Sequence, residues 1–192
     1  MGLTANVVAS TPITSAWGNE IRDRTVQRFA SFAELTSSWT SPGEGAVAYL
    51  TDVNSLHAYN GSAWVAITPR SATVATTVTT SATAYTSLSG GPAVTLQTGP
   101  SALVTLTGNL SIPGGANSVF MACAVSGATT LAATDDASLA FALIPGVAAQ
   151  CSASYLYTGL TPGANTFTAR YRAGTASSVG FGLRQITVVG VP

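Results

Sequence analysis

The sequence predicts a mostly β protein with an N-terminal arm containing a short helix, a small three-stranded β module, and a C-terminal antiparallel β-sandwich of jelly-roll type. Two observations predict this fold class. Alanine, threonine, serine, glycine and valine dominate the composition, and β-branched residues fit a pleated strand whereas glycine ends elements. After residue 91, short apolar runs alternate with turn signals at regular spacing, which is typical of a β-sandwich.

Residues 1–30 form the expected arm. Pro12 fixes its own φ and restricts the residue before it, so the start of the chain is expected to be extended or irregular. Trp17 and Ile21 then fall at helical spacing, which predicts a helix that runs to Gln27. A helix of roughly three turns is too short to be stable alone in water, so it must dock on another surface.

Residues 31–69 form the expected module. Ser31 is a candidate N-cap with Glu34 three residues later, which indicates a short helix. Three alternating apolar runs follow, and Asn60-Gly61 between the last two is a strong hairpin signal. Because so small a sheet is barely stable by itself, we expect another surface to cover one of its faces.

The remaining chain divides at about residue 90. Residues 70–90 are rich in serine, threonine and alanine and predict a linker whose later part is a candidate first strand. Residues 91–192 carry the alternating runs and predict the jelly-roll sandwich. Cys123 and Cys151 each lie in an apolar run, and we expect two small buried side chains rather than a disulfide, with pairing left open.

Charge is scarce and concentrated in the arm. Charged residues make up 7% of the chain, lysine is absent and the formal net charge is zero. Between Arg70 and Arg170 only Asp135 and Asp136 are charged. We therefore expect no binding to nucleic acid, and no apolar run approaches the roughly 20 residues that membrane insertion requires. A surface with so little charge is expected in an assembly that covers much of it.

The sequence offers little support for catalysis. His57 is the only histidine, so a Ser-His-Asp device would depend on it, and no Gly-x-Ser-x-Gly elbow is present. We expect His57 to face solvent on a hairpin. One histidine and two distant cysteines make no zinc set, and for Asp135-Asp136 we favour a plain turn over a calcium site. We expect no enzyme, metal or cofactor, although a hydrolase acting on envelope polymer remains an alternative.

Aromatic residues gather before residue 70. They suit either a sugar-stacking platform or the core of a small module that has little else to bury, and we favour the core. The residues concerned are Trp17, Trp39, Trp64, Tyr49 and Tyr59.

Two stretches resemble a known family. "ITSAWGNEIRDRTVQRFASFAELTSSWTSPGEGAVAYLTDVNSLHAYNGSAW" is similar to the N-terminal region of small bacteriophage virion surface proteins, of the minor tail, head-fibre or capsid decoration type found in phages of actinobacteria. "TPGANTFTARYRAGTASSVGFGLRQITVVGVP" resembles the last strands of phage trimeric jelly rolls. Many relatives carry a long fibre shaft between these parts, and here only a short linker is present, which implies a stubby knob.

The resemblance implies a non-enzymatic structural protein located in the virion. The first residues, "MGLTANVVAS", lack the basic and long apolar regions of a signal peptide, so we expect the protein to be made in a host bacterial cytoplasm. The resemblance also implies a homotrimer whose arm anchors it to other virion proteins of capsid or tail, the two locations remaining open. A helix that packs only on its own domain is the alternative for the arm. The implied anchoring residues are Trp17, Ile21, Arg22, Arg24, Val26, Arg28 and Phe29.

A host-surface glycan-binding module of a phage tail is the alternative function. In that case loop aromatics such as Tyr155 and Tyr157 are the candidate glycan contacts.

Overall fold

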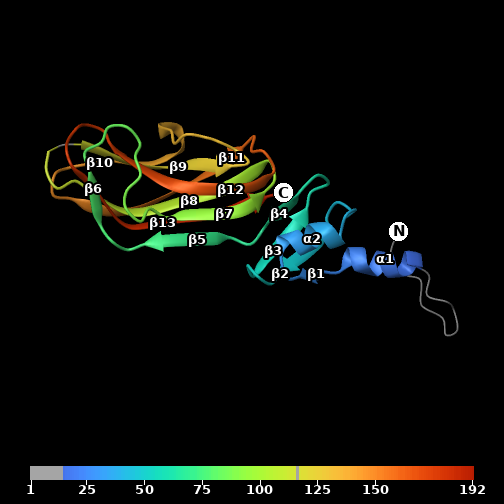
Figure 1. The fold of residues 1–192 in the computed structure, drawn as a ribbon. Coiled ribbons are helices and arrows are strands. Elements are labelled where there is room, and N and C mark those ends of the chain that lie inside the picture. The colour runs from blue at the N-terminus through green and yellow to red at the C-terminus, as the bar shows by residue number, and fades with distance from the viewer. Residues whose placement is uncertain (1–14, 116) are drawn as a thin grey trace.

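The computed structural model describes residues 15–115 and 117–192. Helix α1, a small module and a two-layered sandwich follow one another along the molecule, with α1 projecting from the module on the side away from the sandwich (Figure 1). The expected fold class is confirmed, since most of the described chain is strand and all its strand pairs except β1 (Gln27–Phe29) with β2 (Val47–Leu50) are antiparallel.

Helix α1 (Ser15–Arg24) ends before the expected Gln27. The reason is that Gln27–Phe29 forms strand β1, which pairs in parallel with β2 (Val47–Leu50). Parallel pairing with a strand so distant in sequence gives no local signal, so the sequence pattern alone predicts that these residues belong to the arm. Helix α2 (Phe32–Ser38) starts as expected, because the Ser31 hydroxyl accepts a hydrogen bond from the Glu34 N–H at 3.2 Å.

The module is a four-stranded sheet with α2 beside it. Strands β3 (Ser55–Tyr59) and β4 (Trp64–Ala66) continue the sheet in the order β1-β2-β3-β4. The three antiparallel strands are those the sequence predicts, and β1 adds a fourth.

The sandwich consists of two sheets packed face to face. One has the order β11-β8-β13-β5, with β6 also paired to β13, and the other has the order β10-β9-β12-β7. Its strands are β5 (Arg70–Val74), β6 (Val78–Thr80), β7 (Ala93–Thr98), β8 (Ser101–Ser111), β9 (Asn117–Gly127), β10 (Ser138–Leu143), β11 (Ala148–Thr158), β12 (Gly163–Ala173) and β13 (Val179–Val191), with the 3-10 turn η1 (Asp135–Ala137) before β10.

The chain passes from one sheet to the other at nearly every connection. Strands β5, β8, β11 and β13 build one sheet, and β7, β9, β10 and β12 build the other. This is the connectivity of a jelly roll, in which two Greek keys are wound into a double sheet.

Residues 70–90, expected to be mainly a linker, contribute to the sandwich. Strand β5 pairs with residues 184–188 of β13 and β6 pairs with residues 179–181, on either side of a β-bulge. Further on, Thr86 pairs with Tyr171 of β12. The chain therefore enters the jelly roll directly from the module.

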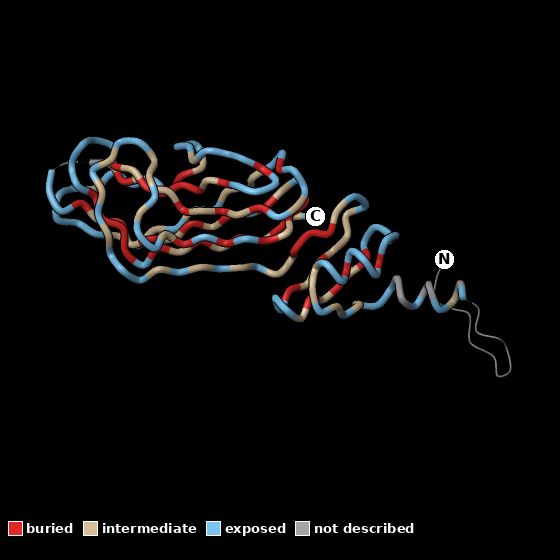
Figure 2. The backbone as a smooth tube through the Cα atoms, viewed as in Figure 1, coloured by how far each residue is buried: buried red, intermediate tan, exposed pale blue. Residues whose placement is uncertain are grey.

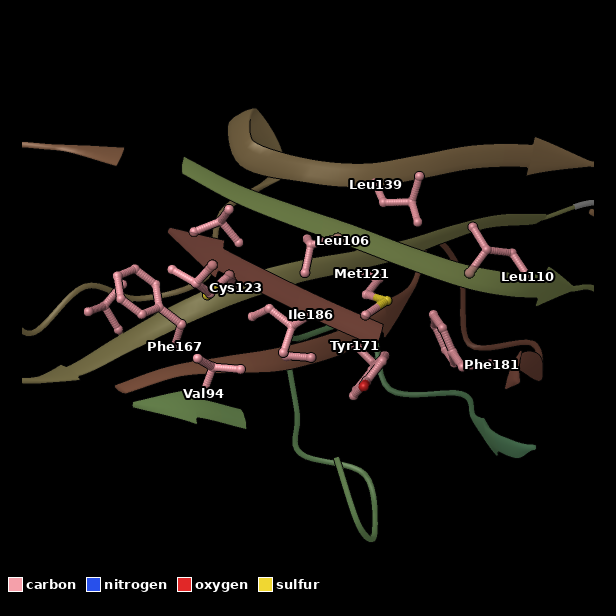
Figure 3. Packing of buried hydrophobic residues seen from close by; sticks show 14 of the residues in the cluster. Val94, Leu106, Leu110, Met121, Cys123, Leu139, Phe167, Tyr171, Phe181 and Ile186 are labelled. Carbon is pink, nitrogen blue, oxygen red and sulfur yellow. The ribbon is translucent and has the colours of Figure 1, made fainter. Parts of the chain in front are cut away.

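The core lies between the two sheets. Figure 3 shows Leu106, Met121, Phe167, Phe181 and Ile186 meeting there from four different strands. Each is fully buried, and the inward residues of β8 and β12 alternate with outward ones, as the period of two in a strand requires. Figure 2 shows a second, smaller group of buried residues inside the module.

The module docks on one end of the sandwich through β4. Val65 and Ala66 are buried, and Ala66 belongs to the sandwich core. Val65 lies against Gly99 and Gly190, where an added Cβ would come within 2.9 and 2.6 Å of its methyl groups. Only glycine leaves room for this contact, so the two parts fit together closely.

Candidate functional site

The residues expected to anchor the protein lie on α1, on strand β1 of the module and between these two elements. On α1, Trp17 is half-buried and Ile21 and Arg24 are exposed. Arg22 falls within α1, but its side chain lies outside the described part of the structure. Val26, between α1 and β1, is among the most exposed large apolar residues in the described chain.

Phe29 has a different place from the one expected. It pairs with Leu50 across β1 and β2, and its ring centroid lies 6.3 Å from that of Trp39. The carbonyl of Phe29 accepts a hydrogen bond from the Thr51 N–H at 2.9 Å. Phe29 therefore packs within the module, whereas its neighbour Arg28 points to solvent from the same strand.

The module core is built from the aromatic residues that the sequence gathers before residue 70. The rings of Trp39 and Trp64 lie 5.4 Å apart, and Tyr59 lies 5.4 Å from Trp64. Both tryptophans are buried. The expectation that these aromatics form a core rather than an open sugar platform is confirmed for Trp39 and Trp64.

His57 is buried, and the expectation that it faces solvent is wrong. Only 3% of it is exposed, its ring lies 5.9 Å from that of Phe32, and its Nδ1 makes no hydrogen bond with the described residues. Burial lowers the pKa of His57; the Ser55 backbone raises it, nearby Arg70 lowers it further, and Asp52 raises it. His57 is therefore a neutral core residue at physiological pH.

A hollow of about 170 Å³ lies beside His57 at the junction of module and sandwich. Its polar lining includes Asp52, Arg70 and Gln97. The Arg70 guanidinium donates to the Val53 carbonyl and so ties the start of β5 to the loop after β2. The hydrogen bonds described here hold the junction together, and none of them orients His57 as a base for a nucleophile.

Asp135 is engaged in an ion pair. Arg172 donates to its carboxylate through Nε at 2.9 Å and also through Nη2, and the Tyr85 hydroxyl donates to Oδ1 at 2.9 Å. The Arg172 guanidinium lies 3.6 Å from the centre of the Phe120 ring. Arg172 holds the pKa of Asp135 below its usual value. Within the described residues no cluster of three or more His, Cys, Asp or Glu side chains is arranged to hold a metal ion.

Tyr155 and Tyr157 lie on the inward row of β11. The Tyr155 hydroxyl donates to the Ser138 carbonyl at 2.6 Å, and the Tyr157 hydroxyl donates to the Cys123 carbonyl at 3.2 Å. The Tyr157 ring also meets the Phe167 ring edge-on. Both side chains link β11 to the opposite sheet, and their role as glycan contacts stays a prediction.

Neither cysteine forms a disulfide. Cys123 is buried, which raises the pKa of its thiol to about 12, and Cys151 is half-buried on β11. The expectation of a small buried side chain is confirmed for Cys123, whereas Cys151 packs against the core but is only half-buried. The helices in the described ranges are too short or too polar to cross a bilayer.

No family model and no curated protein matches the sequence. The fold is similar to solved virus structures: the VP2 subviral particle of infectious bursal disease virus has 12% identity and a TM-score of 0.44, over 76% of this chain and 38% of that chain. The T13 viral particle of the same virus has 14% identity and a TM-score of 0.46, over 79% of this chain and 38% of that chain. This chain thus spans less than two fifths of the length of those proteins.

The CBM22-1 xylan-binding domain of Paenibacillus barcinonensis Xyn10C is also similar, with 12% identity and a TM-score of 0.30 over 65% of this chain and 86% of that domain. These likenesses are too distant to assign a function. The structure itself defines the class: a jelly-roll β-sandwich protein with an aromatic module and a projecting N-terminal helix.

Proposed function

We propose that this chain is a non-enzymatic structural protein of a phage particle, anchored by its N-terminal arm and displaying a homotrimeric jelly roll. The observation that carries the proposal is the arrangement of the arm. Helix α1 extends beyond the module, away from the sandwich (Figure 1), and Ile21 and Val26 expose apolar side chains beside Arg24 and Arg28.

A helix of ten residues gains little stability from its own hydrogen bonds, so a second surface must order it. Apolar side chains supply contact area in such an interface, and arginine is among the residues that contribute most to binding. The alternative, in which the helix packs only on its own domain, has less support, because α1 points away from the module core. The anchoring surface is thus Trp17, Ile21, Arg24, Val26 and Arg28, without Phe29.

The body of the protein fits a surface role in an assembly. The charged residues of the sandwich strands are Arg70, Arg170, Arg172 and Arg184, of which Arg184 is buried. A surface of serine, threonine and small apolar residues gives little electrostatic repulsion when copies lie close together. The homotrimer follows from the resemblance of the last strands to phage trimeric jelly rolls, and cyclic symmetry closes such an assembly without open growth.

The test is a deletion of residues 1–24, which removes α1 and keeps β1 in the module sheet. The expected product is a folded protein with the oligomeric state of the full chain that no longer joins particles. Val53→Ala, a change at an exposed apolar residue of the module, is the matched control and is expected to join particles normally. Normal incorporation of the truncated chain would contradict the anchoring role.

Less supports the glycan-binding alternative. Tyr155 and Tyr157 have their hydroxyl groups engaged across the sandwich and turn toward its interior. If the alternative holds, the full-length protein binds host cell-wall glycan, and Tyr155→Ala weakens that binding without loss of fold. Absence of binding to any susceptible host would remove it.

A further inference from the structure

Strand β11 pairs along its whole length but buries none of its residues. All 11 of its residues are in register with β8, yet its outward residues are exposed and its inward residues are only half-buried. Strand β12, of the same length, buries every inward residue from Asn165 to Ala173. The inward row of β11 includes Ala149, Cys151 and Ala153, which touch the core while remaining partly open to solvent. The sandwich is therefore incompletely covered along this side.

The neighbouring residues are apolar and carry no charge. Ile144 is 74% exposed and Leu156 is 57% exposed, and Phe141 and Val147 are also exposed. No charged residue occurs anywhere between Asp136 and Arg170. Large apolar side chains that are exposed with no charged residue nearby in the sequence mark a candidate interaction surface.

Two strand edges meet on this side. Strand β10 is the edge of one sheet and β11 is the edge of the other, and the Tyr155 hydroxyl joins them through the Ser138 carbonyl. Neither strand contains a proline or a charged residue, and their pairings with β9 and β8 run without a register shift. Exposed edges in natural proteins are usually protected by charge, proline or a bulge, so an edge without such protection indicates a covering partner.

The opposite side of the sandwich differs. There β7 packs against β4 of the module, and β5 begins with Arg70, whose guanidinium is tied to the module. On the side where β10 and β11 are the edges, the exposed apolar residues include those of these two strands and of the loop between them. We call this side the β10–β11 side and define it by Phe141, Ile144, Val147, Cys151 and Leu156.

We infer that the β10–β11 side is the surface through which copies of this chain associate. The inference rests on the homotrimer of the proposed function and identifies the contact surface within it. The absence of charge on this side favours a second copy of this chain as the partner. The surface of a charged partner would lose its hydration and find no opposite charge on this side. A second copy offers a surface of the same uncharged composition, and interface cores are depleted in charged residues in the same way.

The test compares the wild-type mass in solution with that of Ile144→Arg and Leu156→Arg. Both side chains are largely exposed in the single chain, so an arginine there leaves the fold intact, as far-ultraviolet circular dichroism will check. Val53→Arg, at an exposed apolar residue of the module, is the matched control. Light scattering is expected to give an oligomer for wild type and control, and a mass near 19.3 kDa for both variants. At equilibrium, the dissociation constant is expected to rise at least about a hundredfold.

Cys151 supplies a second measurement from the native chain. Its thiol lies on the β10–β11 side, so a maleimide is expected to label it slowly in the wild-type oligomer and at least about tenfold faster in Ile144→Arg. Buried Cys123 is the internal control and is expected to stay unlabelled in both.

Two results would overturn the inference: a monomeric wild type, or an oligomer that both arginine variants leave unchanged. The second result would leave the proposed virion function standing with another interface. Conversely, an oligomer that dissociates as expected but never joins particles would refute the virion function and keep the interface. A monomeric wild type would instead indicate that this side binds a partner of another kind, such as a second virion protein or a glycan.

Discussion

The contact between Val65 and Gly190 gives the sharpest prediction for how the module and the sandwich are joined. In Gly190→Ala, the new Cβ would lie 2.6 Å from Val65 Cγ1 and 2.7 Å from the Ala66 carbonyl oxygen. Both distances are shorter than real Cβ contacts, and a backbone carbonyl cannot move away by changing a rotamer. The module must therefore shift on the end of the sandwich.

Added methyl groups in packed regions cost about 1–3 kcal/mol, and we place this one near the upper limit because one of the two clashing atoms is backbone. The free energy of unfolding, measured by urea denaturation, is expected to fall by about 2–3 kcal/mol. Gly43→Ala is the control, since nothing lies within 4 Å of its Cβ position, and it is expected to change stability by less than about 0.5 kcal/mol.

Gly99→Ala extends the test to a double-mutant cycle. Its Cβ would lie 2.9 Å from Val65 Cγ2 and 3.0 Å from the flexible Asn60 side chain. Val65→Ala removes the nearer atom, so the combined loss of stability is expected to be smaller than the sum of the single losses by about 1 kcal/mol. Equal free energies of unfolding for Gly190→Ala and Gly43→Ala would refute the docking of the module through Val65. Strictly additive losses of stability for Gly99→Ala and Val65→Ala would refute it as well.

Two further predictions concern titration and are read from unfolding free energies at a series of pH values. Because the pKa of His57 is lowered from 6.5 in the folded protein, the unfolded chain takes up the proton first as the pH falls. The free energy of unfolding is therefore expected to be unaffected by His57 above about pH 6.5 and to decline below it. His57→Phe is expected to remove this decline, and an unchanged decline would contradict the burial of His57. Because Arg172 lowers the pKa of Asp135 from 3.8, the ion pair stabilises the fold above that pH and its contribution is lost as the pH falls through the depressed pKa. The pair is partly exposed, so Asp135→Asn is expected to cost about 0.2–1 kcal/mol at pH 7, and a loss above about 2 kcal/mol would contradict this reading.

The jelly roll was predictable because its strands carry strong alternation. The runs in β8 and β12 place a mostly apolar residue at every second position, and those positions are the buried ones. Turn residues separate the runs, so their number and boundaries can be read from the sequence. The connectivity of the two sheets depends on pairings between distant strands and cannot be read in this way.

The prediction of a linker was wrong for residues 70–80, which contain β5 and β6. In the middle of β5 the inward and outward positions are both small residues, which give a weak strand pattern. Ala72 faces the core of the sandwich between exposed Ser71 and Thr73, a pattern that gives almost no apolar signal. The strand exists because β13 supplies its partner.

The burial of His57 could not be predicted from its hairpin. In "SLHAY" it shares a face with Ser55, which a local pattern assigns to solvent. Helix α2 and the end of the sandwich cover that face, and both belong to other parts of the chain.

The helix of the arm was predictable, because its periodicity is present in α1. The place of Phe29 in the module sheet was not, because a three-residue parallel strand has no signature of its own. The β10–β11 side was not recognised, although the absence of charge from residue 137 to 169 was visible. What was missing was the knowledge that β10 and β11 are both edges.

The most direct measurement is the solution mass of the full-length protein by light scattering at two concentrations tenfold apart. A mass near three times 19.3 kDa at both concentrations is the result predicted for a homotrimeric virion surface protein. A mass of 19.3 kDa at both would contradict the trimer and the self-association surface together, and would leave a monomeric jelly roll whose uncharged edges are covered by something else.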